Sequence, residues 1–254
     1  MASLSFIEAE NERYAATLVF LHGLWAGPEI WRALALGFAH RGWRCAVVDA
    51  RETAPQRPSF GEWCDDVAEQ ISGLELPAIT IGHDAGGLVG LNLATRGAVM
   101  ASVAVAPLLA GPKALLDPVT RVRARLGLGA VEPPAVQHAY RNAGTPEVRE
   151  ILTRALTLEP AARIGSLRGA AIQPGAAAVP SLLVAQAQDA IVPSALVEIT
   201  AAGIEADALA LPGSHWPMLE PNPDAWISPI HRWLVRKIGP SLLLLRGDED
   251  LVDE

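Results

Sequence analysis

Three polar residues in this sequence have the types and the order of a nucleophile, an acid and a base. Asp84 stands in the middle of Gly82-His83-Asp84-Ala85-Gly86, between an apolar run and a helical pattern. Asp189 and His215 each follow a later apolar run, so the chain order is nucleophile, acid, histidine. In such a triad the histidine handles protons and the acid orients it. We therefore predict that Asp84, His215 and Asp189 are the catalytic residues.

The glycines around Asp84 predict a sharp turn from a strand into a helix, the nucleophile elbow. Small residues two positions before and after the apex let the backbones approach, and Gly82 and Gly86 occupy these positions. The apex side chain then lies at a helix N-terminus, where the helix dipole favours a negative charge. A glycine-rich turn can also hold a phosphate, but Asp84 would repel one, and the segment lacks the GxGxxG spacing.

A second loop is a candidate source of hydrogen-bond donors for the same site. His22-Gly23-Leu24-Trp25 follows an early apolar run, and its glycine lets the loop present a backbone N–H toward Asp84. We predict an oxyanion hole made by the N–H groups of Leu24 and Ala85, with Trp25 as the alternative to Leu24. The rings of Trp25 and Trp216 are either walls of a substrate-binding pocket or part of the core.

Alternating strands and helices must bring these residues together. Apolar runs predict strands, and amphipathic stretches between them predict helices. The predicted strands span 18–22, 45–49, 78–81, 101–106, 181–187 and 206–211, and the predicted helices span 28–41, 60–71, 86–95, 193–202 and 223–238. This alternation predicts an α/β fold with a parallel sheet covered on both faces. The carboxyl ends of parallel strands share one edge, so the triad residues converge there.

The pattern changes between residues 108 and 175. No convincing strand occurs there, and helices are predicted at 114–126, 134–143, 146–157 and 160–168. We interpret 108–175 as a helical insertion, with 1–107 and 176–254 as the two parts of an α/β core. Residues 108–170 carry a net charge of +4, although the whole chain has −8. The basic residues lie on solvated helix faces, or they attract an anionic small-molecule substrate.

Composition excludes several other classes of protein. The 254 residues are 50% hydrophobic and 19% charged, which predicts a globular chain that needs no disulfide or metal to fold. Cys45 and Cys64 form no CxxC motif, which fits a reducing, cytoplasmic compartment. The acidic balance disfavours nucleic acid as a partner. No apolar stretch is long enough to span a bilayer, so no membrane partner is expected. We expect a monomer or homodimer that uses no metal or organic cofactor.

Taken together, these motifs resemble the α/β-hydrolase-fold superfamily over nearly the whole chain. The helical insertion at 108–175 resembles the cap domain of that superfamily, which implies that it covers the active site. The stretch from His22 to Asp49 is similar to small esterases and hydroxynitrile lyases of the plant methyl-esterase type, which carry Ser at the elbow. An Asp at the elbow is typical of epoxide hydrolases and haloalkane dehalogenases. That resemblance implies that the Asp84 carboxylate attacks a saturated carbon to give an alkyl–enzyme ester. Water activated by His215 would then hydrolyse this ester.

The departures from these families are informative. Haloalkane dehalogenases use a Trp after the nucleophile and often an Asn after His-Gly, where this chain has Ala85 and Leu24, which disfavours dehalogenation. Epoxide hydrolases usually show His-Gly-x-Pro, where this chain has Trp25, and two cap tyrosines that polarise the epoxide oxygen. Only Tyr140 lies in the predicted cap. It is either that donor or a residue of an amphipathic helix.

The leading prediction is an epoxide-hydrolase-like enzyme with a covalent intermediate. The second is a lyase or cyclase of specialised metabolism, in which Asp84 or His215 acts as a base for elimination, such as loss of acetate, or for ring closure. An esterase is the third reading. A non-catalytic receptor for a small molecule is the alternative from a different class.

Overall fold

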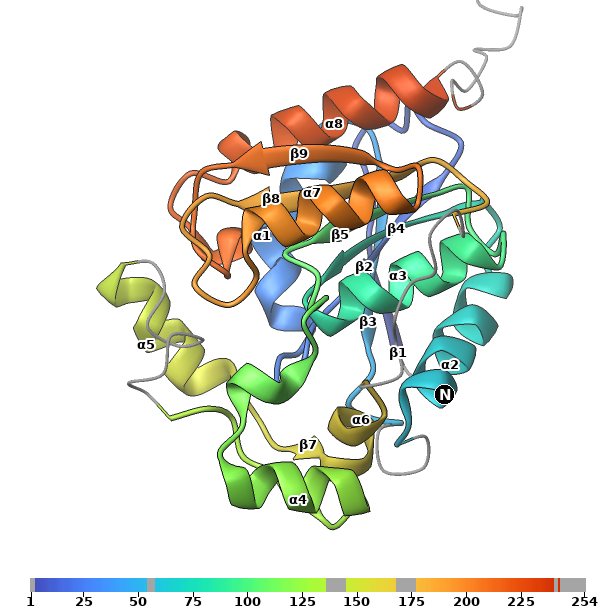
Figure 1. The fold of residues 1–254 in the computed structure, drawn as a ribbon. Helices are drawn as coiled ribbons and strands as arrows, with labels where there is room; N and C mark the ends of the chain where they lie inside the picture. The colour runs from blue at the N-terminus through green and yellow to red at the C-terminus, as the bar shows by residue number, and fades with distance from the viewer. Residues whose placement is uncertain (1–2, 54–57, 136–144, 168–176, 240–241, 243–254) are drawn as a thin grey trace, which may run out of the picture.

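A seven-stranded sheet forms the centre of the computed structural model, which describes residues 3–53, 58–135, 145–167, 177–239 and 242 (Figure 1). The strand order is β1-β3-β2-β4-β5-β8-β9, and the strands are β1 Ser3–Ile7, β2 Thr17–Leu21, β3 Arg44–Asp49, β4 Ala78–His83, β5 Ala101–Val105, β8 Ser181–Gln186 and β9 Asp207–Leu211. Six strands run parallel, and β1 pairs antiparallel with β3. The predicted α/β fold with a mostly parallel sheet is therefore confirmed.

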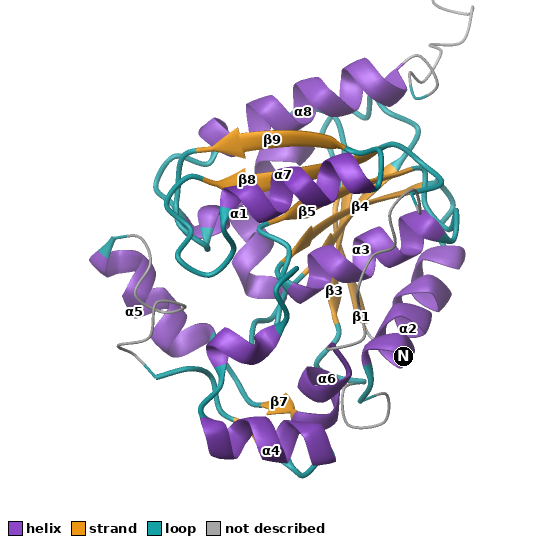
Figure 2. Ribbon diagram, viewed as in Figure 1, coloured by secondary structure: helices purple, strands orange, loops and turns teal. Residues whose placement is uncertain are grey.

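Helices flank this sheet on both faces, as Figure 2 shows in purple. The core helices are α1 Arg32–Ala39, α2 Phe60–Ser72, α3 Ala85–Thr95, α7 Ser194–Gly203 and α8 Asp224–Ile238, and the 3-10 turn η1 Pro28–Trp31 precedes α1. Every residue of β2, β4, β5 and β8 is buried, because each of these strands is covered on both sides. This double burial is why continuous apolar runs, rather than alternating ones, marked the strands in the sequence.

Smaller elements lie between β5 and β8, in the segment predicted to be the cap. They are the 3-10 turn η2 Pro112–Leu115, the helices α4 Pro118–Leu126, α5 Pro146–Ala155 and α6 Ala161–Ser166, and the short strands β6 Ala130–Val131 and β7 Glu159–Pro160. The helix predicted over 114–126 is divided, because Leu116 is extended and Asp117 begins a new helix as its N-cap. Most of the helix predicted over 134–143 and the predicted boundary at 175 lie outside the described residues.

Three strands were not predicted from the sequence. The segment 108–175 was expected to hold no strand, but β6 and β7 pair there antiparallel. Two residues are too few to produce a recognisable pattern. The strand β1 was also missed, because it lies at the sheet edge with mostly exposed or half-buried side chains. Among the helices that the structure describes, none combines the length and apolarity needed to cross a membrane.

Candidate active site

The chain makes a tight turn at Asp84, between the last residue of β4 and the first of α3. Asp84 has φ 54° and ψ −121°, a backbone region that side chains other than glycine rarely adopt. A Cβ on Gly82 would lie 2.2 Å from the carbonyl oxygen of Gly86, and a Cβ on Gly86 would lie 2.3 Å from that of His22. The two glycines therefore permit the turn that the sequence motif predicted, with Asp84 at its apex.

The structure brings the three predicted triad residues together at the carboxyl edge of the sheet. Asp189 follows β8 and His215 follows β9. His215 Nδ1 lies 2.9 Å from Asp189 Oδ2, and His215 Nε2 lies 3.5 Å from Asp84 Oδ2. All three side chains are fully buried. The histidine thus stands between two carboxylates, in a site from which bulk water is excluded.

This arrangement stabilises a positive charge on His215. Burial alone would lower the pKa of His215, but hydrogen bonds and charge interactions with Asp189 and Asp84 outweigh burial and raise this pKa to about 9. Burial acts in the opposite sense on Asp189. Its hydrogen bonds to His215 and to the N–H groups of Ile191 and Val192 nevertheless leave its pKa below the usual value. At neutral pH the resting histidine is therefore an imidazolium ion.

The loop after β2 passes directly against Asp84. A Cβ on Gly23 would lie 2.5 Å from Asp84 Cβ, so only glycine lets the loop come this close. Leu24 and Ala85, whose N–H groups are the predicted oxyanion hole, are both fully buried here. The N–H of Trp25 instead donates to Glu159 Oε2 at 2.9 Å. Because Glu159 occupies this alternative donor, Leu24 remains our prediction.

Two predicted wall residues lie near the triad. The Trp25 ring is buried and donates from Nε1 to the carbonyl oxygen of Val131 in the cap, at 3.1 Å. The Trp216 ring is 5.7 Å from the His215 ring and 4.7 Å from the His83 ring, measured between centroids. Trp216 therefore packs beside the triad histidine, whereas the Trp25 ring joins the loop after β2 to the cap. Tyr140, the third predicted substrate-binding residue, lies outside the described residues.

His83 is a supporting residue that the sequence reading did not identify. Its Nε2–H donates to the backbone carbonyl oxygen of His215 at 2.7 Å, and its ring packs 4.8 Å from the His215 ring. Burial lowers the pKa of His83 to about 3, so it stays neutral beside the charged His215. Its place directly before the apex of the elbow was the available signal.

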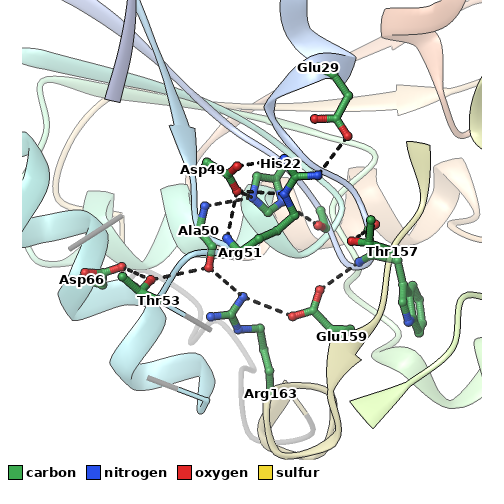
Figure 3. Close-up of polar contacts among 12 residues, drawn as sticks. His22, Glu29, Asp49, Ala50, Arg51, Thr53, Asp66, Thr157, Glu159 and Arg163 are labelled. Carbon is green, nitrogen blue, oxygen red and sulfur yellow. Dashed lines mark hydrogen bonds and ion pairs between the residues drawn. The ribbon is translucent and has the colours of Figure 1, made fainter. Parts of the chain in front are cut away.

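A buried ion pair in the cap lies against the loop after β2 (Figure 3). Arg163 Nη1 lies 3.1 Å from Glu159 Oε1, and the two side chains are 1% and 3% exposed. The Arg163 guanidinium also lies 4.5 Å from the centroid of the Trp63 ring. Burial raises the pKa of Glu159, against the opposing effects of Arg163 and of the Trp25 N–H. The sequence contained only an i,i+4 Glu–Arg spacing, which usually marks a solvated helix face.

His22 has a structural role in the same region. Its Nε2 accepts from the N–H of Ala50 at 3.1 Å, so the proton is on Nδ1, which donates to the carbonyl oxygen of Gly23 at 2.9 Å. Burial lowers the pKa of His22 to about 4, which keeps the ring neutral. The neutral imidazole therefore fixes the loop that carries Leu24.

The other described basic residues of the cap are exposed or half-buried. They are Lys113, Arg121, Arg123, Arg125, Arg149 and Arg154. Their exposure agrees with solvated helix faces, and attraction of an anionic substrate stays a prediction. Among the described residues, no cluster of three or more His, Cys, Asp or Glu side chains could hold a metal ion.

Comparison with known proteins identifies the class. Residues 18–228 match the model of the family described as "Alpha/beta hydrolase family". Because this match covers most of the chain, the protein belongs to the alpha/beta hydrolase family. No curated protein sequence matches the chain.

Solved structures with the same fold carry varied names. A monoacylglycerol lipase from Paleococcus ferrophilus has a TM-score of 0.73 at 17% identity, covering 93% of this chain and 97% of that one. The enol-lactonase from Burkholderia xenovorans LB400 has a TM-score of 0.73 at 18% identity, with 92% and 97% covered. A putative non-heme bromoperoxidase from Mycobacterium tuberculosis has a TM-score of 0.69 at 18% identity, with 93% and 96% covered. At these identities the likeness shows the fold alone.

Proposed function

We propose that this protein is a hydrolase that opens an epoxide-like small molecule through an alkyl ester of Asp84. The observation that carries this proposal is the carboxylate at the apex of the elbow, 3.5 Å from a histidine that a second carboxylate orients. The match to the alpha/beta hydrolase family and the lipase and lactonase names of similar structures support hydrolysis as the general reaction. The epoxide is inferred as the electrophile because the Asp84 carboxylate can attack a saturated carbon.

In the first step the Asp84 carboxylate attacks a carbon of the epoxide. A carbon–oxygen bond forms to Asp84 while the carbon–oxygen bond of the ring breaks, and the ring oxygen becomes an alkoxide. His215, an imidazolium ion in the resting site, donates its proton to this alkoxide. The predicted cap tyrosine Tyr140 is the second candidate donor. The products of the step are a hydroxyalkyl ester of Asp84 and a neutral His215.

In the second step the neutral His215 acts as a base. Esterification removes the negative charge of Asp84, so the imidazole keeps only Asp189 as its charged partner. His215 takes a proton from water, and the hydroxide adds to the ester carbonyl of Asp84. The N–H groups of Leu24 and Ala85 stabilise the resulting oxyanion. Collapse releases the second alkoxide, which takes the proton from the Asp84 carboxylic acid and leaves the diol with both resting charges restored.

A single turnover in water labelled with heavy oxygen tests this route. With enzyme in excess over an epoxide, the diol should receive its new oxygen from the Asp84 carboxylate and therefore carry no label. The label should appear in the peptide that contains Asp84. Label in the diol and none in the peptide would show direct attack by water and overturn the proposal.

A lyase or cyclase is the second candidate, and the place of Tyr14 favours it. Tyr14 stacks on Trp43 at 4.0 Å and is buried against His231, so it belongs to the core and is no donor to the epoxide oxygen. One of the two tyrosines that usually polarise an epoxide is therefore missing, and in the alternative reaction Asp84 or a neutral His215 acts as a base for elimination or ring closure. The pH profile separates the two readings. If the covalent route needs protonated His215, kcat/KM should fall as the pH rises above about 9, the pKa of His215. If the reaction needs neutral His215 as a base, kcat/KM should instead increase as the pH approaches 9.

The remaining readings make different predictions. An esterase would need Asp84 to activate water, because direct attack on an ester would give an anhydride. A receptor would bind its small molecule tightly and never turn it over. We expect Trp25, Trp216 and Tyr140 to line the substrate site, and we expect turnover to survive dialysis against EDTA, because the charges in this mechanism come from side chains.

A further inference from the structure

The outer face of α4 in the cap is apolar. Val119, Val122 and Leu126 have 69%, 58% and 62% of their surface exposed. The described residues contain nine large exposed apolar side chains, and six of them lie between positions 119 and 158: Val119, Val122, Leu126, Leu128, Ile151 and Leu158. Exposed apolar side chains are usually scattered singly over a surface. The concentration of these side chains in the cap therefore indicates a surface that binds a partner molecule or a lipid surface.

Val119, Val122 and Leu126 form an apolar stripe on the side of α4 that faces away from the protein. At about 100° per residue, positions 119, 122 and 126 share one face of a helix, and position 124 lies nearly opposite. Ala124 is buried, and α6 approaches it so closely that a Cβ on Gly165 would lie 2.0 Å from its carbonyl oxygen. Figure 1 shows α4 at the end of the molecule farthest from α8. The helix thus has one face packed on α6 and a second apolar face in solvent.

Positive charge surrounds this stripe. Arg123 and Arg125 lie on its two sides, Arg121 precedes them on a different face of the same helix, and α4 itself contains no acidic residue. All three arginines are exposed, while the whole chain carries a net charge of −8. A contact between two copies through this face would bring together the four guanidinium groups of Arg123 and Arg125, which charge repulsion disfavours. The charge instead fits an anionic surface.

We propose that this face of the cap, α4 with Val119, Val122 and Leu126, docks on an anionic lipid surface. The apolar side chains enter the boundary between headgroups and acyl chains, and the flanking arginines contact lipid phosphates. Because α4 has only nine residues, binding is weak and reversible and needs both contributions. This proposal departs from the expectation of no membrane partner, and it holds whether or not Asp84 forms an ester.

Co-sedimentation with lipid vesicles tests the proposal. The wild-type protein should bind vesicles of equimolar phosphatidylcholine and phosphatidylglycerol, bind vesicles of phosphatidylcholine alone far less, and dissociate as salt is added. The double variant Val122→Ser/Leu126→Ser and the double variant Arg123→Gln/Arg125→Gln should each lower the partition coefficient by roughly tenfold or more. All four side chains are exposed, and circular dichroism would check that the variants fold.

Matched controls exist outside the cap. Ile199 on α7 is 70% exposed, and Arg32 at the start of α1 is exposed, so Ile199→Ser and Arg32→Gln make the same chemical changes elsewhere. Both control variants should bind vesicles as the wild type does. Absence of binding to the mixed vesicles, or binding that the α4 substitutions leave unchanged, would overturn the proposal. Self-association that only the α4 variants lose, without vesicle binding, would identify a second copy as the occupant and would also overturn it.

Discussion

Asp84, His215 and Asp189 form a site with a simple balance of resting charges: one imidazolium ion lies between two carboxylates, and the net charge is −1. The raised pKa of His215 follows from that balance, since both carboxylates lie beside a buried ring. The same balance gives His215 two successive roles in the proposed reaction, as an acid before the ester forms and as a base afterwards. A serine at the apex would remove one of the two negative charges.

The variant Asp84→Ser should exchange one activity for another. Serine carries no carboxylate to open an epoxide, so epoxide turnover should fall by at least about a thousandfold. His215, still oriented by Asp189, could instead take the proton of the serine for attack on an acyl carbon. We expect new hydrolysis of p-nitrophenyl acetate, measured by absorbance. Epoxide turnover that persists in this variant would contradict a nucleophilic Asp84.

The stability of the protein should fall as the pH rises through about 9. The pKa of His215 is raised from 6.5 to about 9 in the folded state, so the folded state binds this proton more tightly than the unfolded chain does. The resulting stabilisation is complete below pH 6.5 and is lost at high pH, with a magnitude of up to about 3 kcal/mol. Urea unfolding at pH values on both sides of this window measures it. His215→Gln should lose this part of the pH dependence, and an unchanged profile in the variant would refute the assignment.

At the scale of elements, the elbow and the cap position these residues. The elbow depends on close backbone contacts between β4, α3 and the loop after β2, at Gly82, Gly86 and Gly23. The cap reaches the same loop through Glu159, which holds the N–H of Trp25. One loop therefore connects the nucleophile to the cap.

A methyl group at the elbow should be far more damaging than one on an open helix face. In Gly86→Ala the new Cβ would lie 2.3 Å from a backbone oxygen, so we expect a loss of about 3 kcal/mol or more. Gly61 on α2 is the matched control, because a Cβ there would meet no atom within 4 Å. Gly61→Ala should increase stability by about 0.5 kcal/mol. Urea unfolding compares the two, and equal effects would argue against the close approach.

The ion pair between Glu159 and Arg163 should show strong coupling in a double-mutant cycle. Glu159→Gln leaves a buried guanidinium without its carboxylate, and Arg163→Met leaves a buried carboxylate without its cation. Each single variant should lose about 3–5 kcal/mol, and the double variant should lose less than the sum. The cycle is measured by urea unfolding. Additive losses would mean that the two side chains do not act as a pair.

The sequence predicted the core elements more accurately than the cap. Strands such as β4 and β8 are buried on both faces, so their apolar runs were recognisable from local composition. The exposed edge strand β1 and the two-residue strands β6 and β7 leave no such pattern, because partners distant in sequence determine them. For the same reason the sequence placed Asp84, Asp189 and His215 at one edge but could not identify Glu159 or His83 as neighbours of the site.

At the scale of the whole molecule, the alpha/beta hydrolase fold places Asp84, Asp189 and His215 at the carboxyl edge of the sheet. The insertion after β5 contributes the cap elements near this edge. The triad residues are fully buried, whereas apolar side chains on the cap face outward. A buried site with tryptophans nearby suits a substrate with apolar character, and the basic, apolar outer face of the cap suits the lipid surface proposed above.

Intact-protein mass spectrometry of His215→Gln tests the central claim most directly. The variant would be incubated with a panel of epoxides, activated esters and acylated enol acids, beside wild type assayed for turnover. If Asp84 is the nucleophile, the variant should accumulate an adduct with the mass of the epoxide, because it can form the ester but cannot activate water. The further change Asp84→Asn should abolish the adduct. Turnover of an epoxide by wild type without any mass gain in the variant would contradict the covalent mechanism.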